Sequence, residues 1–336
     1  MTDPEALRFK LPEKESRRIF ERRIVPQLLA PVQPQDEPVT VVLMGQPGAG
    51  KTAVSALLGQ RLNERGGYAD VDSDLYKPFH PQYARFLRED DRLMTLYTGE
   101  DGRAWMRQAQ QYVRDHRLNA LVQEIAMNPP YLAQNITAYR EAGSRIEVTA
   151  LAVHQALSQQ GILHRYHEQV KDRGHGRLTV PEKAAASYSG MLDSANLIER
   201  EGLADYVAVY RRGESEPRYA NERAHGGWRA KPGFRQAIED QRNRPLTPDE
   251  TRDFLAVQDY LRAEMSPDFH PQLDIIERQA TPLLHPETAD LFRTMRRTSL
   301  EFPHDPGQAT QQPRRDAEQS GPAPEQDRSP RPDLDL

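Results

Sequence analysis

The 336-residue chain contains no cysteine and no long run of apolar residues. The lack of cysteine excludes disulfides, thiolate nucleophiles and cysteine-bound zinc. No apolar stretch approaches the ~20 residues that a membrane-spanning helix requires. The N-terminal segment is charged and lacks the apolar core of a signal peptide. We therefore expect a soluble, cytoplasmic protein that makes no contact with a membrane.

Apolar residues are also scarce, at 37% of the chain, and the mean hydropathy is −0.81. This composition is low for a chain that folds along its whole length, so we expect a globular part with disordered flanks. The net charge of −5 repels phosphate backbones, and no segregated basic cluster stands out in the sequence. The balance of charge argues against nucleic acid as a partner.

What the chain does contain is a regular alternation of strand-like and helix-like segments. Helical patterns separate the strand-like ones, and such alternation is typical of a parallel sheet with right-handed crossovers. We predict one α/β domain over residues 38–215, with helices flanking the sheet. The predicted strands are Val39–Met44, Tyr68–Asp72, Ala120–Glu124, Ile146–Val153 and Asp205–Tyr210.

Outside this domain the pattern changes. Residues 1–37 are predicted to form an N-terminal extension and linker, with a helix over Glu15–Val25 that stops at Pro26. Residues 216–302 are predicted to form a small helical appendage, which begins with a loop over 225–234 and contains a helix capped by Thr247. Residues 303–336 are proline-rich and lack aromatic residues, so we expect a disordered tail.

A phosphate-binding motif of the form G-x-x-x-x-G-K-[ST] follows the first predicted strand and opens a helix. Its glycines let backbone N–H groups surround an anion, to which the helix N-terminus adds its positive end. The motif places Lys51 at the β- and γ-phosphates of ATP and the Thr52 hydroxyl on Mg²⁺. The loop reads Gly45-Gln46-Pro47-Gly48-Ala49-Gly50-Lys51-Thr52.

The motif alone does not say where the γ-phosphate goes. The chain lacks the N-K-x-D motif of GTPases, the L-S-G-G-Q motif of ABC-type ATPases, and the apolar run ending in Asp-Glu that motor ATPases need. Phosphoryl transfer to a small-molecule acceptor is then the leading interpretation. The alternative is an ATP-binding interaction module that signals through its helical region and transfers no phosphate.

Carboxylates follow the second and third predicted strands. Asp72 and Asp74 come at the end of one, and Glu124 ends the other. Because ligand sites of open α/β sheets form at the carboxyl ends of strands, these side chains are candidates for the base and the substrate contacts of a kinase. The competing interpretation of each is a polar turn or a solvated strand end.

Two arginines and a histidine are further candidates. Arg165 lies late in a helical segment, and Arg177 follows a glycine-broken polar loop that could close over the site. Such cations can neutralise the transferring phosphoryl group, although lone arginines are usually surface residues. His80, before a proline, is a candidate for substrate binding or a structural hydrogen-bonding residue.

Taken in order, these pieces resemble the zeta toxin family of P-loop kinases from about Val39 to about Tyr210. The matching segments are GQPGAGKT, DVDSDLYKPFHPQY, LVQE, and the HRY segment with the later GHGR. The resemblance implies a P-loop kinase-type fold and phosphorylation of a sugar hydroxyl of UDP-N-acetylglucosamine by ATP. It makes Asp74 the base, assigns Glu124 to the substrate, and assigns Arg165 and Arg177 to the transferring phosphoryl group. A toxin-like kinase also calls for an antitoxin protein as partner.

The chain departs from the family after Glu124. The family has Gly-Thr there, whereas this chain has Ile125-Ala126. The departure removes a hydroxyl at the acceptor pocket, so a different acceptor such as the ribose of a dinucleotide stays open. The extension and the appendage lie outside the catalytic core, and either could restrain activity.

Overall fold

The computed structural model describes residues 7–301 apart from 90, 177, 180 and 225. The predicted disordered tail, residues 303–336, lies outside the described residues. The chain up to Phe292 forms one compact unit. None of the described helices is both long and apolar enough to cross a bilayer.

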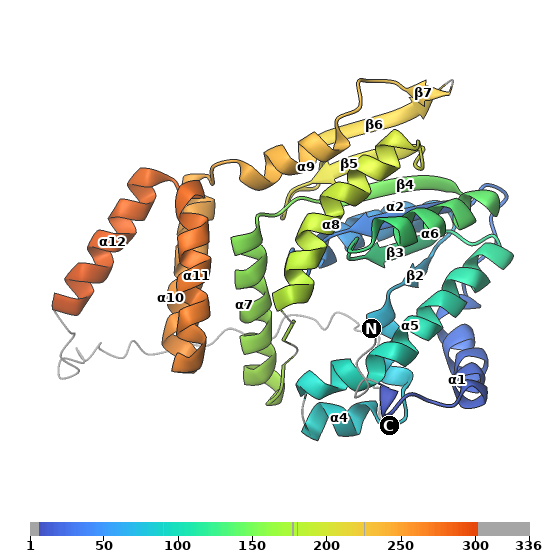
Figure 1. Ribbon diagram of the computed structural model, residues 1–336, viewed down its shortest axis with the longest axis horizontal. Helices are drawn as coiled ribbons and strands as arrows, with labels where there is room; N and C mark the ends of the chain where they lie inside the picture. Colours follow the sequence, from blue (N-terminus) through green and yellow to red (C-terminus); the bar gives the residue numbers. More distant parts are fainter. Residues whose placement is uncertain (1–6, 90, 177, 180, 225, 302–336) are drawn as a thin grey trace, which may run out of the picture. The chain divides into compact units, whose positions relative to one another are not determined.

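The five predicted strands are confirmed, and all pair in parallel. They are β1 (Val39–Met44), β2 (Ala69–Val71), β3 (Ala120–Glu124), β4 (Arg145–Leu151) and β5 (Tyr206–Tyr210). Each is short and largely apolar, as parallel strands covered on both faces usually are. The sheet order is β2-β3-β1-β4-β5-β6-β7, so the strand leading into the phosphate loop lies in the interior of the sheet (Figure 1).

Two further strands were not predicted. β6 (Tyr219–Ala224) pairs antiparallel with β5, and the two-residue β7 (Gly227–Trp228) pairs antiparallel with β6. The expectation of a plain loop over 225–234 is therefore wrong at β7. The segment YANERA carries little apolar patterning because it is near the sheet edge and is stabilised by polar contacts. Buried Asn221, for example, donates to the Ala230 carbonyl (3.0 Å) and accepts the Ala230 N–H (3.1 Å).

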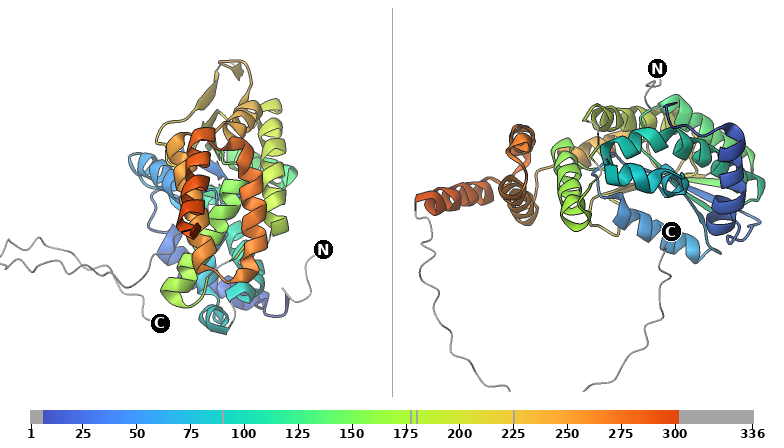
Figure 2. Two further views of the ribbon diagram at one scale, coloured as in Figure 1. Left: turned by 90° about the vertical axis from the view of Figure 1, so that its left-hand side faces the viewer. Right: turned by 90° about the horizontal axis from the view of Figure 1, so that it is seen from below.

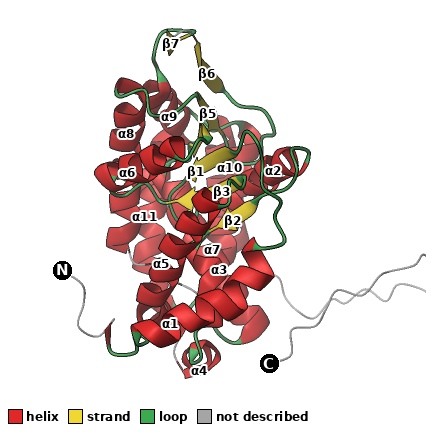
Figure 3. Ribbon diagram, turned by 90° about the vertical axis from the view of Figure 1, so that its right-hand side faces the viewer, coloured by secondary structure: helices red, strands yellow, loops and turns green. Residues whose placement is uncertain are grey.

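Helices surround the sheet (Figure 3). Short 3₁₀ turns cover Lys77–Phe79, Pro267–Phe269 and Thr281–Leu283. The α-helices are α1 (Glu13–Ile19), α2 (Lys51–Asn63), α3 (Ser73–Tyr76), α4 (Tyr83–Glu89), α5 (Asp91–Asp115), α6 (Pro129–Glu141), α7 (Gln155–Arg173), α8 (Pro181–Arg200), α9 (Phe234–Asn243), α10 (Pro248–Glu264), α11 (His270–Ala280) and α12 (Pro286–Glu301).

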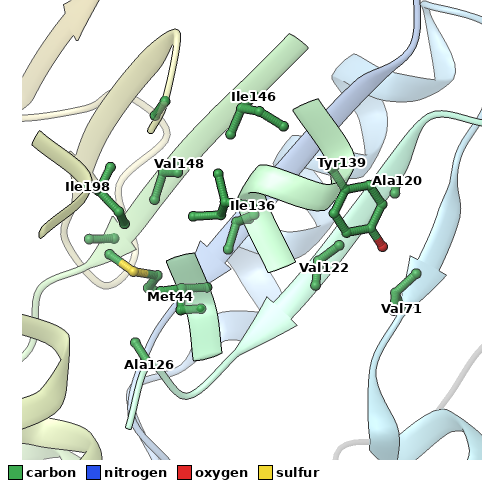
Figure 4. Close-up of a cluster of buried hydrophobic side chains, with 14 of the residues drawn as sticks. Met44, Val71, Ala120, Val122, Ala126, Ile136, Tyr139, Ile146, Val148 and Ile198 are labelled. Carbon is green, nitrogen blue, oxygen red and sulfur yellow. The ribbon is translucent and has the colours of Figure 1, made fainter. Parts of the chain in front are cut away.

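Alternate residues of the strands enter two separate cores. On one face, Val41 and Leu43 of β1 pack with Leu58 of α2. On the other, Met44 and Val122 pack with residues of α5, α6 and α8, as Figure 4 shows for part of this core. Burying both faces holds the strand ends rigidly, and those ends carry the candidate site.

The N-terminal helix differs from the prediction. It does not stop at Pro26 but continues from α1 into a π-helical segment, η2 (Phe20–Leu29), that contains this proline. In a π-helix the N–H bonds the carbonyl five residues back, as Ala30 N–H does with Val25 O at 2.8 Å, and the wider turn accommodates the proline ring. Phe20 and Ile24 are buried against the main core, as expected for residues that face a neighbour.

Helices α10 and α11 pack on α7, which lies between them and the sheet (Figures 1 and 2). The predicted cap of α10 is confirmed, since Thr247 and Glu250 form a reciprocal capping box. A chain of buried amides joins the three helices. Gln160 of α7 donates to Gln258 of α10 (3.0 Å), which donates to the Leu273 carbonyl of α11 (2.7 Å). The division of the chain at residue 215 stays a prediction.

Candidate active site

The phosphate loop joins β1 to α2 and has the backbone that an anion cradle needs. Gly48 and Gly50 both have positive φ, +75° and +85°. A Cβ at Gly48 would lie 2.0 Å from the Ser158 carbonyl oxygen, so α7 and the loop approach too closely for any other residue. Lys51 at the start of α2 donates to Gly45 O at 2.8 Å. The loop therefore fits a nucleotide phosphate at a helix N-terminus.

The loop opens into a cavity of about 900 Å³. Most of the predicted site residues line it, although they are spread over more than 100 residues of sequence. Gly45 and His80 do not line it, and Arg177 lies outside the described residues. The predicted residues in the lining are Gln46, Pro47, Gly48, Ala49, Gly50, Lys51, Thr52, Asp72, Asp74, Glu124 and Arg165.

Asp72 and Asp74 follow β2 and begin the short helix α3. The Asp72 carboxylate accepts the Asp74 N–H at 2.9 Å, which orients the turn. The Asp74 carboxylate accepts from Lys77 Nζ at 2.7 Å, and the Lys77 side chain is only 8% exposed. A nearly buried lysine at this distance fixes the direction of the Asp74 carboxylate. Sequence reasoning missed Lys77, although its spacing of three residues on a helical turn was a usable signal.

Glu124 ends β3 directly beside the end of β1, where it pairs in register with Met44. Burial raises the pKa of the Glu124 carboxyl to about 7; the negative charge of Asp72 reinforces the rise and Lys51 opposes it. The carboxyl group thus changes charge close to neutral pH. A group of this kind in a cavity beside a phosphate loop is typical of a functional site.

The residues after Glu124 form a strained turn. Ala126 has φ +51°, a conformation that L residues rarely adopt. Helix α8 holds the turn, because the Ser187 hydroxyl donates to Ile125 O and the Ser194 hydroxyl donates to Ala126 O at 3.3 Å. A Cβ at Gly190 would lie 2.7 Å from Ala126 O, so the helix approaches closely. Contacts from α8 therefore stabilise the turn at Ile125-Ala126, where this chain departs from the Gly-Thr pattern.

Several cations line the cavity besides Lys51. Arg165 on α7 donates to the Thr179 hydroxyl at 3.3 Å. Arg212, just after β5, donates to Ala49 O at 3.0 Å and Gly48 O at 2.5 Å and so buttresses the loop. Sequence reasoning missed Arg212, although it follows a strand at the same edge as the carboxylates. The other cations in the lining, likewise missed, are Lys77, Arg103, Arg107 and Lys183.

His80 is buried elsewhere. Its Nδ1 accepts the Gln82 N–H at 3.2 Å, so Nε2 carries the hydrogen and donates to Phe9 O at 3.2 Å. The Asp101 carboxylate lies 3.6 Å from Nε2. These contacts give His80 a structural role in holding the N-terminal segment, and its position does not support substrate binding.

The cavity also has oxygen donors that suit Mg²⁺. Thr52, Asp72 and Asp74 all line this cavity. Among the described residues, no group of three or more His, Asp and Glu could hold a metal by itself. Mg²⁺ usually takes one or two protein oxygens and completes its shell with water and substrate phosphates, so these three residues are candidate ligands.

Comparison with known proteins supports a common fold. The model of the family described as zeta toxin matches residues 27–224, more than half of the chain. A search of curated proteins finds no match. A solved structure from the PezAT chromosomal toxin-antitoxin system of Streptococcus pneumoniae is similar, with a TM-score of 0.62 and 15% identity over 76% of this chain and 98% of that chain. A second solved structure, AvrRxo1-ORF1:AvrRxo1-ORF2 with sulphate ions, matches with a TM-score of 0.45 and 13% identity over 79% of this chain and 85% of that chain.

Proposed function

The chain belongs to the zeta toxin family, and from this premise we propose that it is a kinase for a small sugar-nucleotide-like metabolite. The P-loop and the family support ATP-dependent phosphoryl transfer. UDP-N-acetylglucosamine is the first candidate acceptor, on the strength of the family resemblance. The observation that carries the proposal is that a phosphate loop, two strand-end carboxylate sites and several cations line one cavity.

On the nucleotide side, the loop backbone would hold the phosphates and Lys51 would contact the β- and γ-phosphates. The Thr52 hydroxyl would hold Mg²⁺, with Asp72 as a candidate carboxylate ligand. When bound, the metal neutralises charge on the phosphates. Arg165 would neutralise the transferring phosphoryl group, and Arg177 is proposed to join it.

On the acceptor side, Asp74 would be the base. The acceptor hydroxyl gives its proton to Asp74, its oxygen bonds to the γ-phosphorus, and the bond to the β–γ bridging oxygen breaks to release ADP. Lys77 orients the Asp74 carboxylate for this step. Glu124 changes charge near neutral pH. In its ionised form, the Glu124 carboxylate would accept a hydrogen bond from the substrate hydroxyl.

A second acceptor class follows from the departure after Glu124. Met127 and Tyr131 line the cavity and are 40% and 38% exposed. An apolar and an aromatic surface of this kind suits a planar base, whether the uracil of UDP-N-acetylglucosamine or a base of a dinucleotide. Because Ile125-Ala126 replace the family's Gly-Thr, a dinucleotide ribose is the second candidate, and the same carboxylates would serve it.

A partner follows from the same premise. The similar structure from S. pneumoniae belongs to a toxin-antitoxin system. We propose that an antitoxin protein restrains this kinase. Co-expression of a candidate antitoxin should relieve growth inhibition caused by the kinase.

The test is ADP release by purified protein with ATP and Mg²⁺, with and without UDP-N-acetylglucosamine or a dinucleotide, followed by mass spectrometry of the product. Asp74→Asn should lower turnover by about 10²–10⁴-fold and leave ATP affinity nearly unchanged. Asp249→Asn is the matched control, because Asp249 is exposed at the start of α10. Tight ATP binding without turnover on any metabolite would instead favour the interaction-module interpretation.

A further inference from the structure

An arginine outside the predicted catalytic domain reaches the back of the phosphate loop. Arg242 lies in the last turn of α9 and is 2% exposed. Its Nη2 donates to the Gln46 side-chain oxygen at 3.3 Å, and its Nη1 donates to Tyr188 O at 2.8 Å. Its guanidinium carbon lies 3.9 Å from the centre of the Tyr188 ring, and Met191 Sδ lies 3.2 Å from Nη2.

Gln46 is the loop residue that this contact controls. It is 1% exposed, and its Nε2 donates to Val153 O at 2.7 Å and to the Ser158 hydroxyl at 2.8 Å. These two bonds use both hydrogens of the Gln46 NH₂ group, and Arg242 donates to the Gln46 side-chain oxygen. The amide is thereby fixed in one orientation, and the loop is joined to the segment after β4, to α7 and to α9.

Among the described residues, none places a carboxylate oxygen within ion-pair distance of the Arg242 guanidinium, and its Nε has no hydrogen-bond partner. Burial lowers the pKa of Arg242 to about 10 although the charge of Glu239, one turn earlier on α9, opposes the shift, and the side chain is still cationic at neutral pH. A buried cation whose counter-charge lies beyond ion-pair distance is unfavourable by itself.

An anion at the phosphate loop would add a second counter-charge to the distant one of Glu239. The positive charge already acts across the base of the loop, because Arg242 lowers the pKa of His154, the N-cap residue of α7, in addition to the effect of burial. The triphosphate of the proposed nucleotide would bind on the other side of Gln46. The free protein thus carries an electrostatic cost that nucleotide binding relieves.

We propose that Arg242 is a positioning residue of the nucleotide site, which orients the phosphate loop through Gln46 and favours the nucleotide-bound state by its buried charge. This couples α9 to nucleotide binding without contact between them. The proposal rests on the proposed function only in requiring that ATP binds, and it is independent of the acceptor.

The test compares Arg242→Met, Arg242→Lys and Arg235→Met by titration with Mg·ATP and by thermal unfolding with and without it. Arg235 lies on the same helix but is partly exposed and paired with Asp193 and Glu239, so it is the matched control. For Arg242→Met we expect at least tenfold weaker ATP affinity, a smaller nucleotide-induced rise in Tm, and little change in the Tm of the free protein. Lysine should restore part of the affinity because it restores the charge.

A purely structural role predicts another pattern. Arg242→Met would then lower the Tm of the free and bound protein equally and leave the nucleotide-induced rise intact, which would overturn the proposal. Gln46→Ala removes the contact from the other side and provides the test if Arg242→Met does not fold. Its loss of affinity and that of Arg242→Met should be strongly non-additive in the double variant. If the wild-type protein binds no ATP at all, the proposed function fails first.

Discussion

The carboxyl edge of the parallel sheet and the helices α9–α11 contribute to the site in different ways. At the sheet edge, candidate site residues lie at or just after strand ends, as Asp72, Glu124 and Arg212 do. The helices contribute from behind. Arg242 of α9 contacts Gln46 of the loop, and α10 and α11 pack on α7, which approaches the loop at Gly48. One region carries the candidate catalytic residues, and the other supports the phosphate loop.

The largest expected effect concerns the connection between the two regions. Phe254→Ala removes a side chain that is 3% exposed in the core shared by α7 and α10. We expect the free energy of unfolding to fall by about 3–5 kcal/mol. Helix α7 packs against α10 and α11 on one side and against the sheet core on the other. Denaturant unfolding should therefore remain a single transition by both tryptophan fluorescence and circular dichroism.

The matched control is Ile275→Ala on α11. Ile275 is 44% exposed, and its truncation should change stability by less than about 0.5 kcal/mol. Two separated transitions in Phe254→Ala would mean that the helices fold independently of the sheet. The packing on α7 would then not couple the two regions.

A second prediction contrasts one carboxyl group from each region. Glu124 at the sheet edge has its pKa raised to about 7 from 4.5, so the folded state holds its proton where the unfolded state has lost it. The free energy of unfolding of the nucleotide-free protein should fall as pH rises from about 4.5 to about 7, by about 3 kcal/mol at most. Glu124→Gln should remove this slope in denaturant titrations.

Glu250 of α10 should behave in the opposite way. Its hydrogen bonds from Arg244 outweigh burial and lower the pKa of Glu250 to about 2. Its stabilising contribution is present above about pH 4.5 and is lost as pH falls toward 2. Glu250→Gln should therefore lower the free energy of unfolding above about pH 4.5 and should flatten its slope only between about pH 4.5 and 2.

An unchanged slope between pH 4.5 and 7 in Glu124→Gln would show that Glu124 does not hold a proton in the folded state.

The smallest expected effect concerns the acceptor wall. Ser187→Ala removes the hydroxyl that donates to Ile125 O and leaves that carbonyl without this partner. We expect a loss of stability of about 1 kcal/mol, a higher KM for the acceptor, and unchanged ATP affinity. Ser189→Ala is the control, since Ser189 is exposed and bonds only within its own helix. An equal rise in the KM for ATP would place the turn on the nucleotide side.

Local pattern predicted the sheet and much of the site. The strands were found because alternation of strand and helix extends over many residues, and Asp72, Asp74 and Glu124 were found because they stand at strand ends. β6 was missed because a strand near the sheet edge buries little and its sequence is mostly polar. The helix through Pro26 was misjudged because a π-helical turn tolerates proline, which a rule based on α-helices does not anticipate. His80 was selected from its neighbours in sequence, but tertiary packing directs it to Phe9.

By itself, the sequence determined the phosphate loop, the order of strands and helices, and the carboxylates at the cavity. These depend on residues adjacent in the chain, on glycine's access to positive φ, and on the shared edge of parallel strands. Only the tertiary structure brings Arg242 to the loop, Ser187 to the turn at Ile125 and Lys183 to the cavity. Arg242 lies 196 positions from its partner Gln46, and no periodicity links residues on separate helices. Their meeting depends on how α8 and α9 pack on the sheet, because burial and charge are properties of the assembled fold.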